Sequence, residues 1–342
     1  MRLECDVSAT CGGCPKITLD SAQQRELKAA RLQASMGAAG LPPIEANWLY
    51  DDSPVGYRNR IRLRVDDGVP VYFNPHKSVE CAVLEPDLRV ALNSFRLWAK
   101  GYRSELSGLA HLEVRAPDMD GRAGIVYARR PDASSGEPLP HPDGFIAHVL
   151  GEGSPRRQRV RLIDDVFAYV PLGSFRQVNS RANQLMLRTV RALADELGCR
   201  SFCDLFCGSG NLGLPLLRSG LRGAGIESDE HAVAALIAAA VEQGSDASGF
   251  VAGDARSVPP SALCATVPDL LLVDPPRAGL RGDVATVTAV GARHLVLCHC
   301  DAASFVRDLC ALRAAGYTLA RLWLCDMFPH TSHTEIVAYL RV

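Results

Sequence analysis

The sequence lacks an apolar run long enough to cross a membrane. Its longest aliphatic stretch, Ala232–Val241, is far shorter than the roughly 20 residues that a spanning helix needs. The first residues also lack the apolar core of a secretory signal peptide. These absences predict a cytoplasmic protein with no membrane partner, and nothing in the sequence indicates an obligate protein partner.

The sequence also lacks a large excess of charge of either sign. The net formal charge of the 342 residues is −1, so any nucleic-acid contact must use a local basic patch. Lysine contributes only 4 of the 37 basic residues. Arginine suits phosphate and base recognition, but the same bias can reflect codon usage. Composition therefore leaves the binding partner open.

The two halves of the chain differ in their sequence pattern, and the chain is long enough for two domains. Residues 48–170 have the alternation and turn sequences of β-hairpins, whereas strands and helices alternate from about Asn183, as in a parallel sheet covered on both faces. The expected elements of the first half are the helix Ala22–Met36 and the strands Arg58–Val65, Val69–Phe73, Leu112–Ala116, Gly124–Arg129 and Phe145–Val149. The expected strands of the second half are Ser201–Phe206, Arg222–Glu227, Gly249–Ala252, Asp269–Asp274, His294–Cys298, Tyr317–Cys325 and an antiparallel Thr334–Val342.

A glycine-rich turn follows the first strand of the second half. Residues 204–213 read DLFCGSGNLG, and Glu227 ends the next strand about twenty residues later. This pattern matches the dinucleotide fingerprint, in which an acid binds a ribose. S-adenosylmethionine enzymes use the same turn and acid, and a purely structural turn is a third interpretation. Both cofactor interpretations place a nucleotide-type ligand at the carboxyl ends of the strands.

The ends of the next two strands favour methyl transfer over hydride transfer. Asp254 follows one strand, and Asp274-Pro275-Pro276-Arg277 follows the other. A rigid Asp-Pro-Pro turn directs a carboxylate and carbonyls into the cleft. Amino-methyltransferases place an aromatic residue after such a pair, so Arg277 argues against methylation of an amino group.

Cys300 is the candidate nucleophile. It follows the apolar run His294–Cys298 and precedes a helical pattern over Ala302–Ala315, which Asp301 can cap. A thiol beside the positive end of a helix dipole is expected to favour the thiolate. Glu335 opens the antiparallel final strand and is therefore expected at the same rim. The pair suggests covalent catalysis on an electrophilic ring.

Five segments resemble the RNA uridine carbon-5 methyltransferase family. In order they are Phe175–Asn179, residues 204–213, residues 270–280 (LLLVDPPRAGL), residues 300–308 and residues 326–335 (DMFPHTSHTE). The resemblance implies a Rossmann-like class I methyltransferase domain over 171–342 and a β-rich, cluster-binding domain over 1–170. It further implies an RNA substrate, with 23S ribosomal RNA favoured by the compact layout and transfer RNA second.

The resemblance also assigns roles to residues. Cys300 would be the nucleophile and Glu335 the general base, and the expected S-adenosylmethionine contacts are Gln177, Phe206, Glu227 and Asp274, with Asp254 as a fifth. The chemistry needs such a pair: a thiolate added at carbon 6 of uracil makes carbon 5 nucleophilic, and a base must later remove the carbon-5 proton. The family commonly has Asn-Pro after the nucleophile where this chain has Asp301-Ala302. The Asp301 charge would oppose thiolate formation. Cys298 is the rival nucleophile, expected in the core.

Three cysteines near the start, Cys5, Cys11 and Cys14, form C-x5-C-x2-C, and Cys81 is the only other cysteine of the first half. In a reducing compartment such clusters bind metal more often than they form disulfides. Four thiolates fit either zinc or an iron–sulfur cluster. The resemblance implies a [4Fe–4S] cluster, expected to hold the N-terminus against the β-rich domain.

Two arginine-rich segments are candidates for RNA contact. Arg58, Arg60, Arg62 and Arg64 alternate along one strand and share a face, and residues 156–161 hold a second group. A solvated strand face explains the first stripe almost as well. A dehydrogenase and a non-catalytic iron–sulfur RNA-binding protein are the alternative functions.

Overall fold

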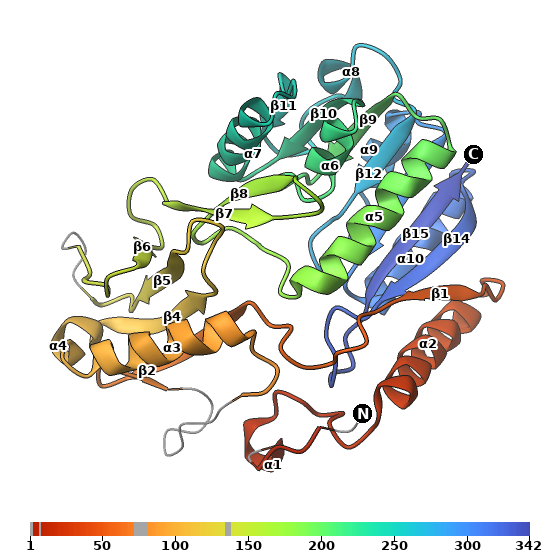
Figure 1. Cartoon of the computed structure of the whole chain (residues 1–342). Helices are drawn as coiled ribbons and strands as arrows, with labels where there is room; N and C mark the ends of the chain where they lie inside the picture. Colours follow the sequence, from red (N-terminus) through yellow and green to blue (C-terminus); the bar gives the residue numbers. More distant parts are fainter. Residues whose placement is uncertain (1–2, 7, 72–80, 134–137) are drawn as a thin grey trace.

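An eight-stranded sheet forms the centre of the computed structural model, which describes residues 3–6, 8–71, 81–133 and 138–342 (Figure 1). The strands lie in the order β1 (Ala46–Leu49), β14 (Thr318–Cys325), β15 (Glu335–Arg341), β13 (His294–His299), β12 (Leu270–Val273), β9 (Ser201–Leu205), β10 (Arg222–Glu227) and β11 (Gly249–Ala252). Every neighbouring pair is parallel except the two that involve β15. The predicted α/β fold with an antiparallel final strand is confirmed.

Helices cover both faces of this sheet. One face carries α5 (Ser180–Glu196), α6 (Gly213–Arg218) and α7 (Glu230–Glu242), and the other carries α2 (Ser21–Ala38), α9 (Val284–Ala289) and α10 (Ala302–Ala314), with the short α8 (Pro260–Leu263) near β10 and β11. Alternate residues of β12 point to opposite faces, so Leu270 and Leu272 pack in one core and Leu271 and Val273 in the other. Among the described residues no helix combines the length and apolarity that a membrane crossing requires.

The β-rich part forms a separate five-stranded sheet. Its order is β3 (Val69–Val71), β2 (Arg60–Asp66), β4 (Leu109–Arg115), β5 (Ala123–Arg129) and β6 (Phe145–Val149), with α3 (Pro86–Ala99) and α4 (Arg103–Leu106) beside it and α1 (Ser8–Cys11) near the N-terminus. Both expected hairpins are present, although the expected strand end at Phe73 lies outside the described residues. A two-stranded hairpin, β7 (Arg157–Arg161) and β8 (Phe167–Pro171), leads into the second half.

The chain does not divide into packing units at residue 170. β1 pairs in parallel with β14, with Leu49 opposite Cys325, and Met36 of α2 lies in the core under α10. At the other side of the expected division, Val160 and Phe167 of the β7–β8 hairpin pack in the core with α5 and α7. The physical reason is that an unpaired strand edge is unfavourable: β1 pairs with the edge of β14 that would otherwise be open.

A buried ion pair attaches α2 to the β14–β15 loop, which comprises residues 326–334. Lys28 Nζ lies 2.6 Å from Asp326 Oδ1, and the two side chains are 2% and 6% exposed. The same ammonium donates to the Phe328 carbonyl at 3.1 Å, and the Asp326 N–H donates to the Leu49 carbonyl at 2.8 Å. The loop is thereby fixed from α2 and from β1 just before it reaches Glu335.

His330 fixes the middle of this loop. Its backbone is left-handed, with φ of 65°, and its side chain is fully buried. Its N–H donates to Gln24 Oε1 at 2.6 Å, and its carbonyl accepts from the Lys16 N–H at 2.9 Å. The ring nitrogens lie 3.2 Å from Gln24 Nε2 and 3.1 Å from the Pro54 carbonyl, an arrangement satisfied by the neutral ring with Nε2 protonated. Burial lowers the pKa of His330, in keeping with that neutral form.

We expect Asp326→Ala to lower the free energy of unfolding by about 3–5 kcal/mol, because it leaves the Lys28 ammonium buried without its carboxylate. The double variant Lys28→Met/Asp326→Leu should lose far less, since an apolar pair of similar volume needs no charge compensation. Urea unfolding of both variants measures the difference. Equal losses would contradict the view that the unpaired charge is the cause.

Candidate active site

A cavity of about 840 Å³ opens at the carboxyl ends of the parallel strands. Its size is at the upper end of small-molecule pockets and leaves room for more than one ligand group. The structure brings all seven expected catalytic and cofactor residues to its lining: Gln177, Phe206, Glu227, Asp254, Asp274, Cys300 and Glu335. Residues that lie up to 158 positions apart in the chain therefore share one cavity.

The glycine-rich turn between β9 and α6 forms one wall. Phe206, Gly208 and Gly210 have φ values of 66°, 52° and 84°, so the backbone is left-handed at three points. A Cβ atom on Gly210 would lie 2.7 Å from the Leu214 side chain, which excludes any larger residue without rearrangement. The Gly208 N–H donates to Glu227 Oε2 at 3.1 Å, so the turn and the acid of β10 form one unit.

The two outer acids differ in their environment. Glu227 Oε1 accepts hydrogen bonds from Ser228 Oγ at 2.8 Å and from the Asp229 N–H at 3.0 Å, which fixes its carboxylate at the cavity wall. Asp254 is 44% exposed and pairs with Arg256 Nε at 2.9 Å. That hydrogen bond lowers the pKa of Asp254. A ligand reaching Asp254 must therefore share it with Arg256.

Three carboxyl groups lie in or beside the cavity: Asp274 and Glu335 line it, and Asp204 is buried within β9. Burial and the charges of Asp274 and Glu227 raise the pKa of Asp204 well above its usual value, and Asp204 finds no hydrogen-bond partner among the described residues. Burial also raises the pKa of Asp274 and of Glu335, and the Asp274 charge raises that of Glu335 further. A nearby cation would favour the ionised forms of these acids and lower their pKa values, and the sulfonium of S-adenosylmethionine is such a cation. The glycine turn and the acids therefore fit that cofactor.

Glu335 is placed by the direction of its strand. It is the first residue of β15, opposite Cys325 of β14, and its neighbour Ile336 is opposite His299 of β13. Because β15 is antiparallel, its first residue lies at the carboxyl edge of the parallel strands. Glu335 is 3% exposed and lines the same cavity as Cys300, as the sequence predicted.

The expectation that the surroundings favour the Cys300 thiolate is wrong for the ligand-free site. Burial, followed by the charges of Glu335 and Asp274, raises the pKa of the Cys300 thiol to about 11, and only Arg277 among the charged neighbours opposes them. The expected effect of Asp301 is also different. Its carboxylate accepts the Ser304 N–H at 2.9 Å and caps α10, whereas the carboxylates that raise the pKa are across the cavity.

The rival thiol is inaccessible. Cys298 is fully buried, and burial raises its pKa well above the usual value, whereas Cys300 is half-buried and lines the cavity. The structure thus favours Cys300 as the reactive cysteine.

A buried group behind Cys300 was not singled out from the sequence. His299 Nε2 lies 3.3 Å from Asp308 Oδ2, and the same oxygen accepts the Leu280 N–H at 2.7 Å. Arg307 pairs with Asp308 at 2.9 Å and donates to the Ala278 carbonyl at 2.8 Å. These contacts connect the Asp-Pro-Pro-Arg segment to α10 and to the residue before Cys300. The only sequence signal is the neighbouring Arg-Asp pair on a helix.

The four N-terminal cysteines lie near one another. All are partly exposed and free, and the charges of Cys81, Cys11 and Cys5, after burial, raise the pKa of Cys14 to about 11. Within the described ranges, no three His, Cys, Asp or Glu side chains converge as the ligands of a single metal ion do.

Known proteins resemble the chain over nearly its whole length. The 23S rRNA (uracil(1939)-C(5))-methyltransferase RlmD of Marinomonas sp. is 29% identical over 97% of this chain and 79% of the relative. The protein of the same name from Pseudomonas aeruginosa is 29% identical over 98% of this chain and 80% of its own length. The 23S rRNA (uracil(747)-C(5))-methyltransferase RlmC of Shewanella amazonensis is 32% identical over 57% of this chain and 52% of the relative. No model of a protein family matches.

A solved structure shares the fold. The Pyrococcus abyssi tRNA (uracil-54, C5)-methyltransferase, in complex with S-adenosyl-L-homocysteine, superposes with a TM-score of 0.75 at 24% identity, over 97% of this chain and 86% of the other. The sheet order, the glycine turn and the acidic cavity define a Rossmann-like, S-adenosylmethionine-dependent methyltransferase. Within that class, the chain resembles RNA uracil C5-methyltransferases over nearly its whole length.

We expect the alkylation of Cys300 by iodoacetamide to become about tenfold faster per pH unit between pH 7 and pH 10. The thiolate reacts, and below a pKa of about 11 its fraction rises tenfold per unit. Peptide mass spectrometry measures the rate, with the buried Cys298 as an internal control that stays unmodified. A rate that levels off near pH 8 would show an ordinary, unshifted thiol.

Proposed function

We propose that this enzyme methylates carbon 5 of a uridine in RNA, with S-adenosylmethionine as methyl donor and 23S ribosomal RNA as substrate. The meeting of Cys300 and Glu335 in one cavity with the glycine turn carries the proposal. The names of the relatives that match over 97% and 98% of the chain support ribosomal RNA. Transfer RNA is the alternative substrate, because the reacting residues are the same for any unpaired uridine. The expected compartment is the cytoplasm, where both RNAs occur.

Cys300 would open the reaction. Its sulfur forms a bond to carbon 6 of the uracil, and the electron pair of the carbon 5–carbon 6 double bond moves to carbon 5 and the neighbouring carbonyl. Carbon 5 then takes the methyl group that S-adenosylmethionine supplies in electrophilic form. The uridine must be unpaired or flipped out of a helix to reach the cavity. The charge of Arg277 lowers the pKa of Cys300 and so favours the thiolate.

Glu335 would complete the reaction. Its carboxylate removes the proton from carbon 5, the double bond reforms, and the bond between carbon 6 and the Cys300 sulfur breaks. Burial beside Asp274 raises the pKa of Glu335, which makes its ionised form a stronger base. A sulfonium beside these acids would keep Glu335 ionised before methyl transfer. The base gains strength once that positive charge is gone.

We expect Cys300→Ala to abolish methylation, and Glu335→Gln to stop turnover after bond formation, because the glutamine cannot take the carbon-5 proton. The second variant should accumulate a covalent protein–RNA complex that survives denaturing electrophoresis. Assays with labelled S-adenosylmethionine and RNA from a strain lacking the gene measure both effects. Cys298→Ala, two residues away, is the matched control and should keep most of the activity. Methylation by Cys300→Ala would refute the proposal, and would leave the non-catalytic and dehydrogenase alternatives to be tested.

We further propose that Cys5, Cys11, Cys14 and Cys81 hold a [4Fe–4S] cluster. Support comes from the four neighbouring thiols and from the anchoring of their segments. The Lys16 N–H binds the His330 carbonyl at 2.9 Å, and the Gly56 N–H binds the Ala82 carbonyl at 2.8 Å. The cluster would crosslink these segments, and methyl transfer itself needs no electron.

Protein purified without oxygen should be brown and contain about four irons per chain. Cys81→Ala should lose the colour, because three thiolates remain, whereas Cys310→Ala on α10 should keep it. Iron analysis and absorption spectra measure both. Colourless protein with one zinc per chain would contradict the cluster and leave the methylation proposal untouched.

A further inference from the structure

Arg176 is a half-buried arginine, two of whose nitrogen atoms are buried without a partner among the described residues. It lies on the segment between β8 and α5 and contributes to the lining of the large cavity. Its Nε and Nη1 atoms are shielded from solvent and make no hydrogen bond with any described residue. A guanidinium has five N–H donors, and buried donors in proteins almost always have acceptors. The missing acceptor is the observation to be explained.

Two further arginines of the five-stranded sheet lie close by. Arg60 of β2 and Arg115 of β4 share one carboxylate, since Glu113 accepts from Arg60 Nη1 at 2.9 Å and from Arg115 Nε at 2.8 Å. Arg115 also donates to the Pro171 and Ser174 carbonyls, so its donors are used within the protein. One carboxylate, that of Glu113, is bound to two of the three guanidiniums, so the group carries a surplus of two positive charges, and Arg176 has no carboxylate bound to it among the described residues.

The nearest carboxyl group that faces Arg176 does not balance it. Burial raises the pKa of Glu85, and Glu85 lies within electrostatic reach of Arg176 without forming an ion pair with it. Burial and the Arg115 charge lower the pKa of Arg176 to about 10, so it is still charged at neutral pH. An unpaired charge in such a place destabilises the folded protein. It is therefore expected to serve a ligand.

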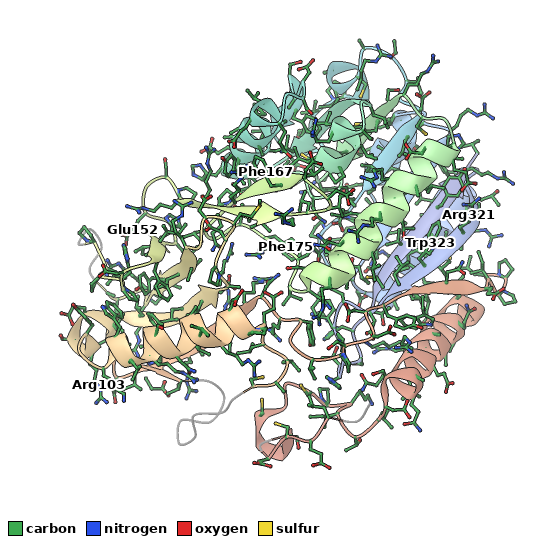
Figure 2. All side chains as sticks on the ribbon, in the orientation of Figure 1. Arg103, Glu152, Phe167, Phe175, Arg321 and Trp323 are labelled. Atoms are coloured by element: carbon green, nitrogen blue, oxygen red, sulfur yellow. The ribbon has the colours of Figure 1, made fainter. Side chains whose placement is uncertain are left out.

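Phe175, the residue before Arg176, lies at the protein surface. Its side chain is 69% exposed, and the Arg60 guanidinium lies 5.7 Å from its ring centroid. Figure 2 shows Phe175 beside the start of α5, between the two sheets. The cavity lining thus extends from Cys300 and Glu335 at the large sheet to Phe175 and Arg176 on the segment between β8 and α5.

We propose that Arg176, flanked by Arg60 and Arg115, binds a phosphodiester of the RNA strand whose uridine reaches Cys300. The planar fork of a guanidinium matches the two free oxygens of a phosphodiester. The carboxylate of the methyl donor is the competing anion. The cofactor wall, however, is formed by Gly208 and Glu227, whereas the charged neighbours of Arg176 come mainly from the five-stranded sheet. The inference rests on the proposed RNA substrate.

The test compares Arg176→Met with Arg313→Met, which removes an exposed arginine of α10 that does not line the cavity. The ligand is a uridine-containing single-stranded RNA of about ten nucleotides, titrated at several salt concentrations. We expect Arg176→Met to weaken binding about ten- to hundredfold at low salt, as for the loss of a charged hydrogen bond. The slope of log affinity against log salt should fall by about 0.7, the value for one phosphate contact on a single strand. Arg313→Met should keep the wild-type slope.

Two further measurements separate binding from structure and from the cofactor. The melting temperature of Arg176→Met without RNA should equal or exceed that of the wild type, because an uncompensated buried charge is removed. Its affinity for S-adenosylhomocysteine should be unchanged. A wild-type salt slope, a loss of S-adenosylhomocysteine affinity with intact RNA binding, or a lowered melting temperature would each overturn the inference.

The proposed function can fail separately. A wild-type protein that binds the RNA but never methylates it would refute the methyltransferase proposal, while the salt slopes would still test Arg176. Conversely, full methylation by the wild type with an unchanged slope in Arg176→Met would refute the phosphate site alone.

Discussion

The ion pair between Lys28 and Asp326 is the contact on which the position of Glu335, the proposed catalytic base, depends. It joins a helix from the first forty residues to a loop from the last twenty, and both side chains are almost fully buried. A buried ion pair of this kind contributes little net stability when it is intact. Removing one partner is costly, because the other charge stays buried without compensation. The loop is therefore held in one arrangement, and Glu335 follows it directly. Helix α2 thus helps to position Glu335 at the rim of the cavity.

A second constraint is the concentration of acids in the cavity. The charge of Asp274 raises the pKa of Asp204 and of Glu335, which burial also raises, and the charges of Glu335 and Asp274 raise the pKa of Cys300 to about 11. The Cys300 thiol in this cavity is therefore protonated at neutral pH. A cation entering it would shift both the acids and the thiol toward ionisation. Reactivity is in this way coupled to occupancy, which protects the thiol in the resting protein.

Much of this arrangement could be predicted from local sequence. Apolar runs ending in Asp274 and Cys300 mark strand ends, and the final run had to be antiparallel for Glu335 to reach them. β1 could not be predicted, since four residues with a central Asn and Trp form a strand only because β14 offers an open edge. The raised pKa of Cys300 could not be predicted for a related reason. The position of Cys300 just before α10 can be read from the local sequence, whereas burial and the distant carboxylates of Glu335 and Asp274 raise the pKa.

The cysteine segments and the catalytic base are connected through the same loop. The Lys16 N–H, two residues after Cys14, donates to the His330 carbonyl, and the Tyr57 hydroxyl donates to the Pro329 carbonyl at 3.1 Å. The Tyr57 N–H in turn donates to the Val83 carbonyl, two residues after Cys81. The loop that ends at Glu335 is therefore bonded to the chain neighbours of cysteines from both segments. Because His330 holds a left-handed backbone inside this frame, the loop cannot shift without breaking several buried hydrogen bonds at once. A group that crosslinked the cysteines would stiffen the frame around the base, and that accounts for its place in an enzyme whose chemistry requires no electron transfer.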